Sequence, residues 1–371
     1  MKIILVSPKK HFWKSLELII NNIKNSLNDW KVVDDIQVIN EDDTVLLLND
    51  CDIWEDVIKH IPKKTKLLIP IFGNLTIEVK RWQILKDILV DRDIKFICGS
   101  KRQANQVSFL LNTSEVFECV FPLPPLEVKP IHSQKVEMIY AGRITEQKNV
   151  LELMQSFHKV CRLFDLDFML NIAGDFHERG HHLHGFKTEN YHNACKKIME
   201  QSQFIKFHGN LSQANLHKLY HASNISVSLS TYHDEDFGLS IAQALQYGHK
   251  LVLSDWGGHG NYIEHFNSIA VPVSIRERVA TPDMNSFEKM LVNLVAPTIV
   301  DLEEQILLAK SYFSFESFQE NLNSLIESPW NKFMGISEFY NKYLKISENY
   351  YPFHRDQEEN LYDPIYQFYL G

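Results

Sequence analysis

The sequence predicts an α/β protein with two doubly wound parallel sheets. Short apolar runs typical of buried strands alternate with segments of helical periodicity along most of the 371 residues. A proline-rich stretch, Phe121 to Leu126, interrupts this alternation, which restarts at Val136. Alternating strands and helices are typical of parallel sheets covered by helices, and the interruption indicates two such sheets in sequence.

The interruption also predicts the domain organisation. We expect an interdomain linker near residues 122–133, which ends an N-terminal domain of residues 1–128. A C-terminal domain then covers residues 129–330. Residues 331–371 supply a last helix and an aromatic tail, and we expect both to pack back on the N-terminal domain, since so many aromatic side chains rarely stay in water.

The N-terminal elements follow from apolar runs and amphipathic spacing. The predicted strands are residues 2–6, 32–39, 45–48, 67–71, 94–98 and 116–121. The predicted helices are residues 12–27, 53–60, 77–90 and 101–111. Lys9, Lys10 and His11 follow the first strand, and we favour a solvated loop there over a contact to phosphate or acceptor.

The C-terminal elements repeat the alternation. The predicted strands are residues 136–140, 168–173, 205–208, 225–229, 250–253 and 268–273. The predicted helices are residues 150–163, 190–201, 213–221, 286–295, 301–312 and 336–346, with further helices that start near Gly238 and after Ser314. Ser212 and Ser314 are predicted N-caps.

Composition narrows the class of protein. The hydrophobic content of 44% and the charged content of 23% are those of an ordinary globular protein, and the net charge of -9 argues against a nucleic-acid binder. The N-terminal apolar run is too short for a signal peptide, and five cysteines without paired spacing predict reduced core residues. We expect a cytoplasmic protein. Scattered lysines in the first half leave a peripheral contact with the inner membrane face open.

The stretch from Leu229 to Gly258 carries the first chemical signal. A polar loop with Glu235 follows a buried strand, and Phe237-Gly238 opens a short helix. A helix that begins just after a parallel strand directs unpaired N–H groups toward the carboxyl edge of the sheet, where phosphate binds well. Gly238 lets a ligand approach the backbone closely. The pattern therefore predicts a phosphate-binding edge.

A second loop supplies positive charge. Residues 141–149, AGRITEQKN, follow the strand at 136–140 and precede a long amphipathic helix. Arg143 and Lys148 in this loop can clamp a pyrophosphate, and Gly142 precedes them. Taken alone, the loop would be interpreted as a solvated one with ordinary charges, and the downstream Glu235 motif favours the pyrophosphate clamp.

Together these motifs resemble the retaining glycosyltransferases of family 4 (glycosyl transferases group 1), which have the GT-B fold. The family pattern of Glu, seven residues and Glu around Phe-Gly corresponds to Glu235 and Gln243, so the second Glu is replaced. Asn149 stands where Gly is usual, and Asn261 where Glu is frequent. The resemblance is specific from about residue 136 to residue 325. It implies two Rossmann-like domains that face a central cleft.

The resemblance implies a hexosyltransferase-like enzyme that moves a sugar, with retention, from a UDP- or GDP-linked donor to a glycan, lipid-linked or protein acceptor. The implied catalytic residues are Glu235, Arg143 and Lys148. The implied donor-binding residues are Gly142, Arg143, Lys148, Gly209, Leu211, Glu235, Phe237, Gly238, Leu239 and Gln243. His11 and Asn74 are candidates for a catalytic residue of the N-terminal domain.

No cofactor and no metal are expected. His177, His181, His182 and His184 form a cluster, but no Cys or carboxylate pattern completes it. The alternative function is a catalytically weak, glycosyltransferase-like partner subunit. Gln243, Asn149, Asn261 and the aromatic tail favour that alternative, whereas the retained cations and Glu235 favour the enzyme.

Overall fold

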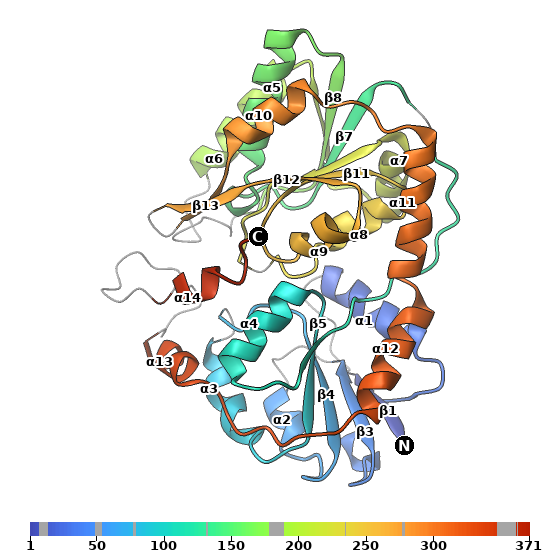
Figure 1. Cartoon of the computed structure of the whole chain (residues 1–371), viewed down its shortest axis with the longest axis vertical. Helices are drawn as coiled ribbons and strands as arrows, with labels where there is room; N and C mark the ends of the chain where they lie inside the picture. Colours follow the sequence, from blue (N-terminus) through green and yellow to red (C-terminus); the bar gives the residue numbers. More distant parts are fainter. Residues whose placement is uncertain are drawn as a thin grey trace. The chain divides into compact units, whose positions relative to one another are not determined.

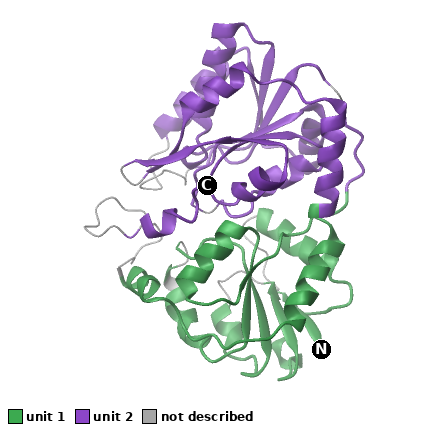
Figure 2. Cartoon of the chain, in the orientation of Figure 1, with its two compact units in different colours: residues 1–125, 312–352 green, residues 126–311, 353–371 purple. Residues whose placement is uncertain are grey.

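The computed structural model describes residues 1–6, 14–48, 54–76, 79–130, 133–177, 189–233, 235–276, 279–346, 361 and 363–371. The chain divides into two compact units (Figure 2). Unit 1 comprises residues 1–125 and 312–352, and unit 2 comprises residues 126–311 and 353–371. Each unit has its own six-stranded parallel sheet, which confirms the predicted doubly wound α/β class.

Unit 1 is built on a sheet with the strand order β2-β1-β3-β4-β5-β6. Its strands are β1 (Lys2–Val6), β2 (Lys31–Val33), β3 (Thr44–Leu48), β4 (Lys66–Ile71), β5 (Ile94–Cys98) and β6 (Val116–Glu118). Its helices are α1 (Lys14–Ser26), α2 (Trp54–Ile58), α3 (Val79–Ile88), α4 (Lys101–Leu111), α12 (Phe315–Glu327) and α13 (Glu338–Ile346), with a 3-10 turn at Ile36–Val38. Every residue of β3 and β5 is buried, as continuous apolar runs predict for central parallel strands.

Unit 2 is built on a sheet with the order β12-β11-β10-β7-β8-β9, of which Figure 1 labels β7, β8, β11 and β12. Its strands are β7 (Val136–Ala141), β8 (Phe168–Ala173), β9 (Ile205–Gly209), β10 (Ile225–Ser228), β11 (Lys250–Ser254) and β12 (Ser268–Val271). A hairpin of β13 (Val273–Arg276) and β14 (Val279–Pro282) follows. The helices are α5 (Val150–Phe164), α6 (Glu189–Gln201), α7 (Gln213–Ala222), α8 (Leu239–Leu245), α9 (His259–His265), α10 (Met284–Val292), α11 (Ile299–Tyr312) and α14 (Asp363–Tyr366), with a 3-10 turn at Glu146–Lys148.

Helices cover both faces of the unit 2 sheet. On one face, side chains of α5, α6 and α10 pack with Met138 and Leu170 in a large apolar cluster. On the other face, Tyr220 of α7 and Ala244 of α8 pack against Ile139. Met138 and Ile139 are successive residues of β7, and their side chains point to opposite faces of the sheet. Alternate residues of one strand therefore pack against the helices on each face.

Each sheet has a point where the direction of strand addition reverses. In unit 2 this switch point lies between β7 and β10, which pair in parallel at Met138 and Ile225. Open α/β sheets bind ligands beyond the carboxyl ends of the strands at such a point. In unit 1 the switch point lies between β1 and β3, and the residues that follow those strands, including Lys9, Lys10 and His11, lie outside the described residues.

The unit boundaries differ from the predicted domains at α12, which belongs to unit 1 and not to the C-terminal domain. Lys95 of β5 is fully buried, and its ammonium donates to the carbonyl oxygens of Leu325 (2.6 Å) and Ser328 (3.2 Å) at the end of α12. A cation at a helix C-terminus satisfies terminal carbonyls and interacts well with the helix dipole. This contact, together with the bond from Lys2 to Asn323 (2.7 Å), ties α12 to the first sheet.

The predicted packing of residues 331–371 on the N-terminal domain holds for only part of that stretch. Helix α13 belongs to unit 1, where the Tyr340 hydroxyl donates to the carbonyl of Leu75 (2.6 Å). The last residues belong to unit 2, because Tyr369 stacks on the buried ring of Trp256. Tyr366 and Tyr369, which are described tyrosines of the aromatic tail, are therefore buried, as expected, but on the other unit. Tyr350, Tyr351, Phe353 and Tyr362 lie outside the described residues.

Local predictions hold elsewhere. Ser212 and Ser314 cap α7 and α12 through their side chains. Cys98, Cys119, Cys161 and Cys195 are free and buried, whereas Cys51 lies outside the described residues. Burial raises the pKa of Cys119, Cys161 and Cys195 to about 12. Within the described part of the chain, no helix has the length and apolarity needed to cross a bilayer.

Candidate functional site

The switch point of unit 2 brings two predicted site loops together. The loop of residues 142–149 connects β7 to α5, and the loop of residues 229–238 connects β10 to α8. Because β7 and β10 are neighbouring parallel strands, both loops leave the same edge of the sheet at adjacent positions. The structure therefore brings Arg143, Lys148 and Glu235 to one site. No local sequence pattern shows that β7 and β10 are neighbours.

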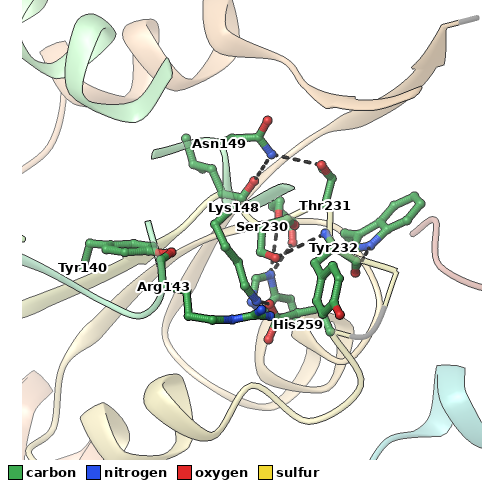
Figure 3. Close-up of polar contacts among 12 residues, drawn as sticks. Tyr140, Arg143, Lys148, Asn149, Ser230, Thr231, Tyr232 and His259 are labelled. Carbon is green, nitrogen blue, oxygen red and sulfur yellow. Dashed lines mark hydrogen bonds and ion pairs between the residues drawn. The ribbon is translucent and has the colours of Figure 1, made fainter. Parts of the chain in front are cut away.

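Asn149 fastens the two loops to each other. Its backbone is left-handed, with φ of 51°, a conformation in which Asn is the commonest substitute for Gly. Its side-chain amide donates to the carbonyl of Leu229 (2.7 Å) and to the hydroxyl of Thr231 (2.9 Å) (Figure 3). The Thr231 N–H donates in turn to the carbonyl of Gln147 (3.0 Å). Asn149 thus has the left-handed backbone conformation that Gly adopts readily, and it adds side-chain hydrogen bonds that Gly could not make.

The two cations of the first loop converge on Tyr232 (Figure 3). The Arg143 guanidinium lies 5.2 Å from the centre of the Tyr232 ring, and the Lys148 ammonium lies 5.1 Å from it. Both distances are those of cation–π contacts. The carbonyl of Arg143 accepts a bond from the Tyr140 hydroxyl (2.6 Å), which fixes the start of the loop. Tyr232 therefore holds two positive groups side by side at the sheet edge.

Lys148 also forms an ion pair with Glu235. The two side chains are only 15% and 10% exposed, so water screens the pair weakly. Burial by itself would raise the pKa of the Glu235 carboxyl, but the charges of Lys148 and His259 outweigh burial and lower it to about 2. Glu235 is consequently an ionised, acceptor-only group at neutral pH.

The last residue of β11 and the segment that follows this strand support the loop that carries Glu235. The Ser254 hydroxyl donates to the carbonyl of Ser230 (2.5 Å), and the Trp256 indole N–H donates to the carbonyl of Tyr232 (2.9 Å). The Gly258 N–H donates to the carbonyl of Glu235 itself (2.6 Å). A side chain at Gly258 would put its Cβ 2.3 Å from the Asp236 carbonyl oxygen, so only glycine permits this close approach.

Gly238 sits directly beside Glu235. Its φ of 67° requires the left-handed backbone, and a Cβ there would lie 3.5 Å from Oε1 of Glu235. Leu239 and Gln243 lie on the half-exposed face of α8, opposite the buried Ile241, Ala242, Ala244 and Leu245. Phe237 differs from them, because it is 7% exposed and its ring packs near Tyr262. Phe237 is therefore a core residue that supports the loop.

The remaining predicted donor residues line the same sheet edge farther along. The Gly142 N–H donates to the carbonyl of Ala173 (2.9 Å), and the Gly174 N–H donates to that of Gly209 (2.8 Å). Gly209 is the last residue of β9 and Leu211 follows this strand, which is two strands from β7. At the usual strand spacing they lie roughly 10 Å along the edge from Gly142. They extend the edge without joining the charged cluster.

The sequence analysis did not single out every residue of this site, and one of its candidates, Asn74, lies in the other unit. Tyr232, Trp256 and His259 contribute to it. The stretch 229–258 as a whole contains Tyr232 and Trp256, whereas no sequence pattern indicated His259. Asn74 of unit 1 is buried, donates to Gln106 (2.9 Å) and accepts from the N–H of Thr76 (2.9 Å), which is a structural role.

Metal binding has no support among the described residues, where no group of three His, Cys, Asp or Glu side chains can hold an ion. His177 is the one member of the predicted cluster that is described, since His181, His182 and His184 lie outside those residues.

Residues 126–280 match the sequence model of the family described as Glycosyl transferases group 1. No curated protein matches the chain. Among solved structures, the chain is similar to HepE from Anabaena in complex with UDP and glucose, with a TM-score of 0.63, 14% identity and coverage of 89% of this chain and 100% of that one.

A glycosyltransferase from Rickettsia africae gives a TM-score of 0.59 at 14% identity and covers 88% of this chain and 99% of its own. TarM from S. aureus gives 0.56 at 14% identity over 86% of this chain, and the chain spans 60% of TarM. These likenesses show the fold, which is the GT-B fold that the sequence predicted.

Proposed function

We propose that the chain is a glycosyltransferase that uses a nucleotide-diphosphate sugar as donor. The observation that carries the proposal is the cluster of Arg143, Lys148 and Glu235 at the switch point of the unit 2 sheet. The match of residues 126–280 to the group 1 family supports the same reading.

In the proposed reaction, the bond between the anomeric carbon and a diphosphate oxygen breaks. The oxygen of an acceptor hydroxyl forms the new bond to the anomeric carbon, and the proton of that hydroxyl passes to the departing diphosphate oxygen. The leaving diphosphate gains charge as the bond lengthens, and fixed cations stabilise that charge without reorganisation. Arg143 and Lys148 are the groups we assign to it. The backbone N–H groups of Gly238 and Leu239 are further donors at the start of α8, where no described side chain caps the helix.

Glu235 is assigned to the sugar. With a pKa lowered to about 2, its carboxylate can accept hydrogen bonds from donor-sugar hydroxyls and stabilise positive charge that develops near the anomeric carbon. Lys148 links the two roles, because the ammonium that pairs with Glu235 is also assigned to the diphosphate. Donor binding must therefore redistribute this ion pair.

The finer assignments rest on the family resemblance. They are membership of family 4, retention of anomeric configuration, a UDP- or GDP-linked donor whose base lies near Gly209 and Leu211, and a glycan, lipid-linked or protein acceptor. HepE is in complex with UDP and glucose in its crystal structure, which makes UDP the first nucleotide to test. A cytoplasmic location, with or without a peripheral contact to the inner membrane face, stays a prediction.

The alternative of a catalytically weak partner subunit loses one of its arguments. Asn149 retains the left-handed backbone expected of Gly at that position, so this departure does not imply a degraded loop. Gln243 is the departure that still favours the alternative.

Calorimetry with UDP and GDP tests the proposal. The native protein should bind at least one of them, and Arg143→Ala and Lys148→Ala should each weaken binding about tenfold or more, because charge-assisted bonds contribute about 1.5–3 kcal/mol. Lys159→Ala is the matched control, since Lys159 is an exposed cation of unit 2 paired with Glu288 (2.6 Å).

Failure of the native protein to bind either nucleotide would favour the partner subunit. Equal binding by the native protein and the three variants would mean that Arg143 and Lys148 do not contact the nucleotide. Where transfer to an added acceptor is measurable, the anomeric configuration of the product, read by NMR, decides whether the reaction retains it.

A further inference from the structure

The last residues of the chain pack on the segment that follows β11. The Tyr369 ring stacks on Trp256 with a centroid separation of 4.8 Å and an angle of 18° between planes. Trp256 is fully buried, and Tyr369 is 3% exposed. The carbonyl of Tyr369 accepts from the Gly257 N–H (2.9 Å), and Leu370 forms an antiparallel bridge with Trp256. Figure 1 shows this segment in red, running from α14 to the C-terminus of the chain.

The same segment also contacts the loop of Glu235 directly. The Tyr369 hydroxyl donates to the carbonyl of His233 (2.6 Å). One residue earlier, the carbonyl of Tyr232 accepts from the indole N–H of Trp256 (2.9 Å). The Trp256 indole and the Tyr369 hydroxyl, whose rings stack on each other, therefore bind the carbonyls of two neighbouring loop residues, Tyr232 and His233.

The contacts continue to the charged cluster. The Gly258 N–H, two residues after Trp256, donates to the carbonyl of Glu235 (2.6 Å), while the Tyr232 ring lies over the Lys148 ammonium. The described residues of the loop, 229–233 and 235–237, lie outside the helices and strands. Contacts from neighbouring segments, together with the turn bond from the Glu235 N–H to the carbonyl of Tyr232 (3.1 Å), therefore help to set the conformation of the loop. Fixing backbone residues in one conformation costs conformational entropy, which such contacts must offset.

We propose that Tyr369 is a positioning residue, which acts through Trp256 to hold the Tyr232–Glu235 segment in the conformation that pairs Glu235 with Lys148. This inference deepens the proposed function and rests on it for the identity of the ligand. Tyr369 contacts Trp256, Gly257 and the carbonyl of His233, so we expect its effect on a donor to be exerted through the loop. Preorganising a binding loop raises affinity by reducing the ordering cost at the moment of binding.

The test uses the full-length chain with three substitutions. Tyr369→Ala removes the stack and the hydroxyl, and Tyr369→Phe removes the hydroxyl alone. Tyr340→Phe is the matched control, since Tyr340 is a buried tyrosine of unit 1 whose hydroxyl also donates to a carbonyl at 2.6 Å. Hydrogen exchange is measured at the amides of Glu235 and Gly258, with β8 amides as the internal reference.

Tyr369→Ala should speed exchange at the Glu235 and Gly258 amides about tenfold or more while β8 amides stay unchanged, because local opening is cheaper without the stack. Tyr369→Phe should give a smaller increase at the same amides, which keeps the test open if the alanine variant does not fold. Tyr340→Phe should leave them unchanged. In parallel, Tyr369→Ala should weaken UDP binding about tenfold, with Tyr369→Phe close to native.

Uniform acceleration across unit 2, or no acceleration at Glu235 in either variant, would overturn the positioning role, whichever nucleotide binds. A native protein that binds no nucleotide would overturn the proposed function, and the exchange result would still decide whether Tyr369 holds the loop.

Discussion

Lys148 and Glu235 form an ion pair across the boundary between β7 and β10, although 87 residues separate them in the sequence. The pair is almost fully buried, and it joins the two groups that we assign to opposite parts of the donor. A buried cation that is already paired must share or lose its partner when a diphosphate binds. Under the proposed function, the carboxylate therefore competes with the diphosphate for Lys148.

Glu235→Gln should separate nucleotide binding from transfer. Removing the carboxylate charge leaves Lys148 without its competing partner, so the affinity for UDP should rise about threefold to tenfold. Sugar transfer should fall at least about a hundredfold, because a carboxylate near the anomeric carbon is lost. Calorimetry and turnover measure the two effects.

Glu288→Gln provides the control for this change, since Glu288 belongs to the exposed Lys159 pair of the same unit. Its UDP affinity should equal that of the native protein. Weaker UDP binding by Glu235→Gln would mean that Glu235 orders the loop more than it competes with the diphosphate.

His249 predicts a pH dependence of stability. It is fully buried, and burial lowers its pKa from 6.5 to about 4, while its Nε2 lies 2.7 Å from the carbonyl of Tyr220. The unfolded chain takes up a proton at this histidine below about pH 6.5 and the folded protein does not. The contribution of His249 to stability is therefore complete above pH 6.5 and is lost as the pH falls toward 4.

Urea unfolding between pH 4 and 8 checks this dependence. The native protein should lose up to about 1.4 kcal/mol per pH unit in that window through His249. His249→Gln should show a correspondingly flatter curve, and His265→Gln, at an exposed histidine of the same unit, serves as the control for the substitution. Parallel curves for the native protein and His249→Gln would show that the buried imidazole is not kept neutral.

The sequence predicted the parts of the fold that depend on neighbouring residues. The continuous apolar runs of β3 and β5 and the helical periodicity of α4 are local patterns, and the structure confirms these elements to within a residue at each end. The predicted strand at residues 268–273 was wrong in its extent, because the chain leaves the sheet after Val271 and starts the β13–β14 hairpin. Short apolar runs do not indicate where a strand changes partner.

The assignments that failed depend on contacts between distant residues. Helix α12 follows the C-terminal unit in sequence but packs on unit 1, because the ammonium of Lys95, more than 200 residues earlier, donates to carbonyls at the end of the helix. The tail was expected on the N-terminal domain, yet its stacking partner is Trp256. Periodicity identifies an apolar face or an aromatic cluster, but it does not specify which other surface will cover it.

Activity should not require a divalent metal. The proposed site meets the diphosphate with Arg143, Lys148 and backbone N–H groups, which already supply the positive charge that a metal ion would bring. Transfer or donor hydrolysis in excess EDTA should retain most of the activity measured with Mg²⁺. Complete loss in chelator, restored by Mg²⁺ or Mn²⁺, would contradict this assignment.

The last prediction concerns Gln243, where the resembled family has Glu. Gln243 lies on the half-exposed face of α8, one turn beyond Leu239, and its neighbours Ala242 and Ala244 are small and fully buried. A carboxylate here would accept from both ribose hydroxyls, whereas an amide accepts from one hydroxyl and donates to the oxygen of the other. We therefore expect Gln243 to bind the ribose with weaker anchoring than Glu, by about 1 kcal/mol.

Three variants make this measurable by calorimetry with UDP and GDP. Gln243→Glu should tighten binding of whichever nucleotide the native protein prefers about fivefold, and Gln243→Ala should weaken it. Gln246→Glu, which lies on the same face nearly one turn farther along, adds the same charge without reaching the ribose and should bind as the native protein does. If Gln246→Glu changes affinity as much as Gln243→Glu, the effect is one of charge near the diphosphate and Gln243 does not contact the ribose.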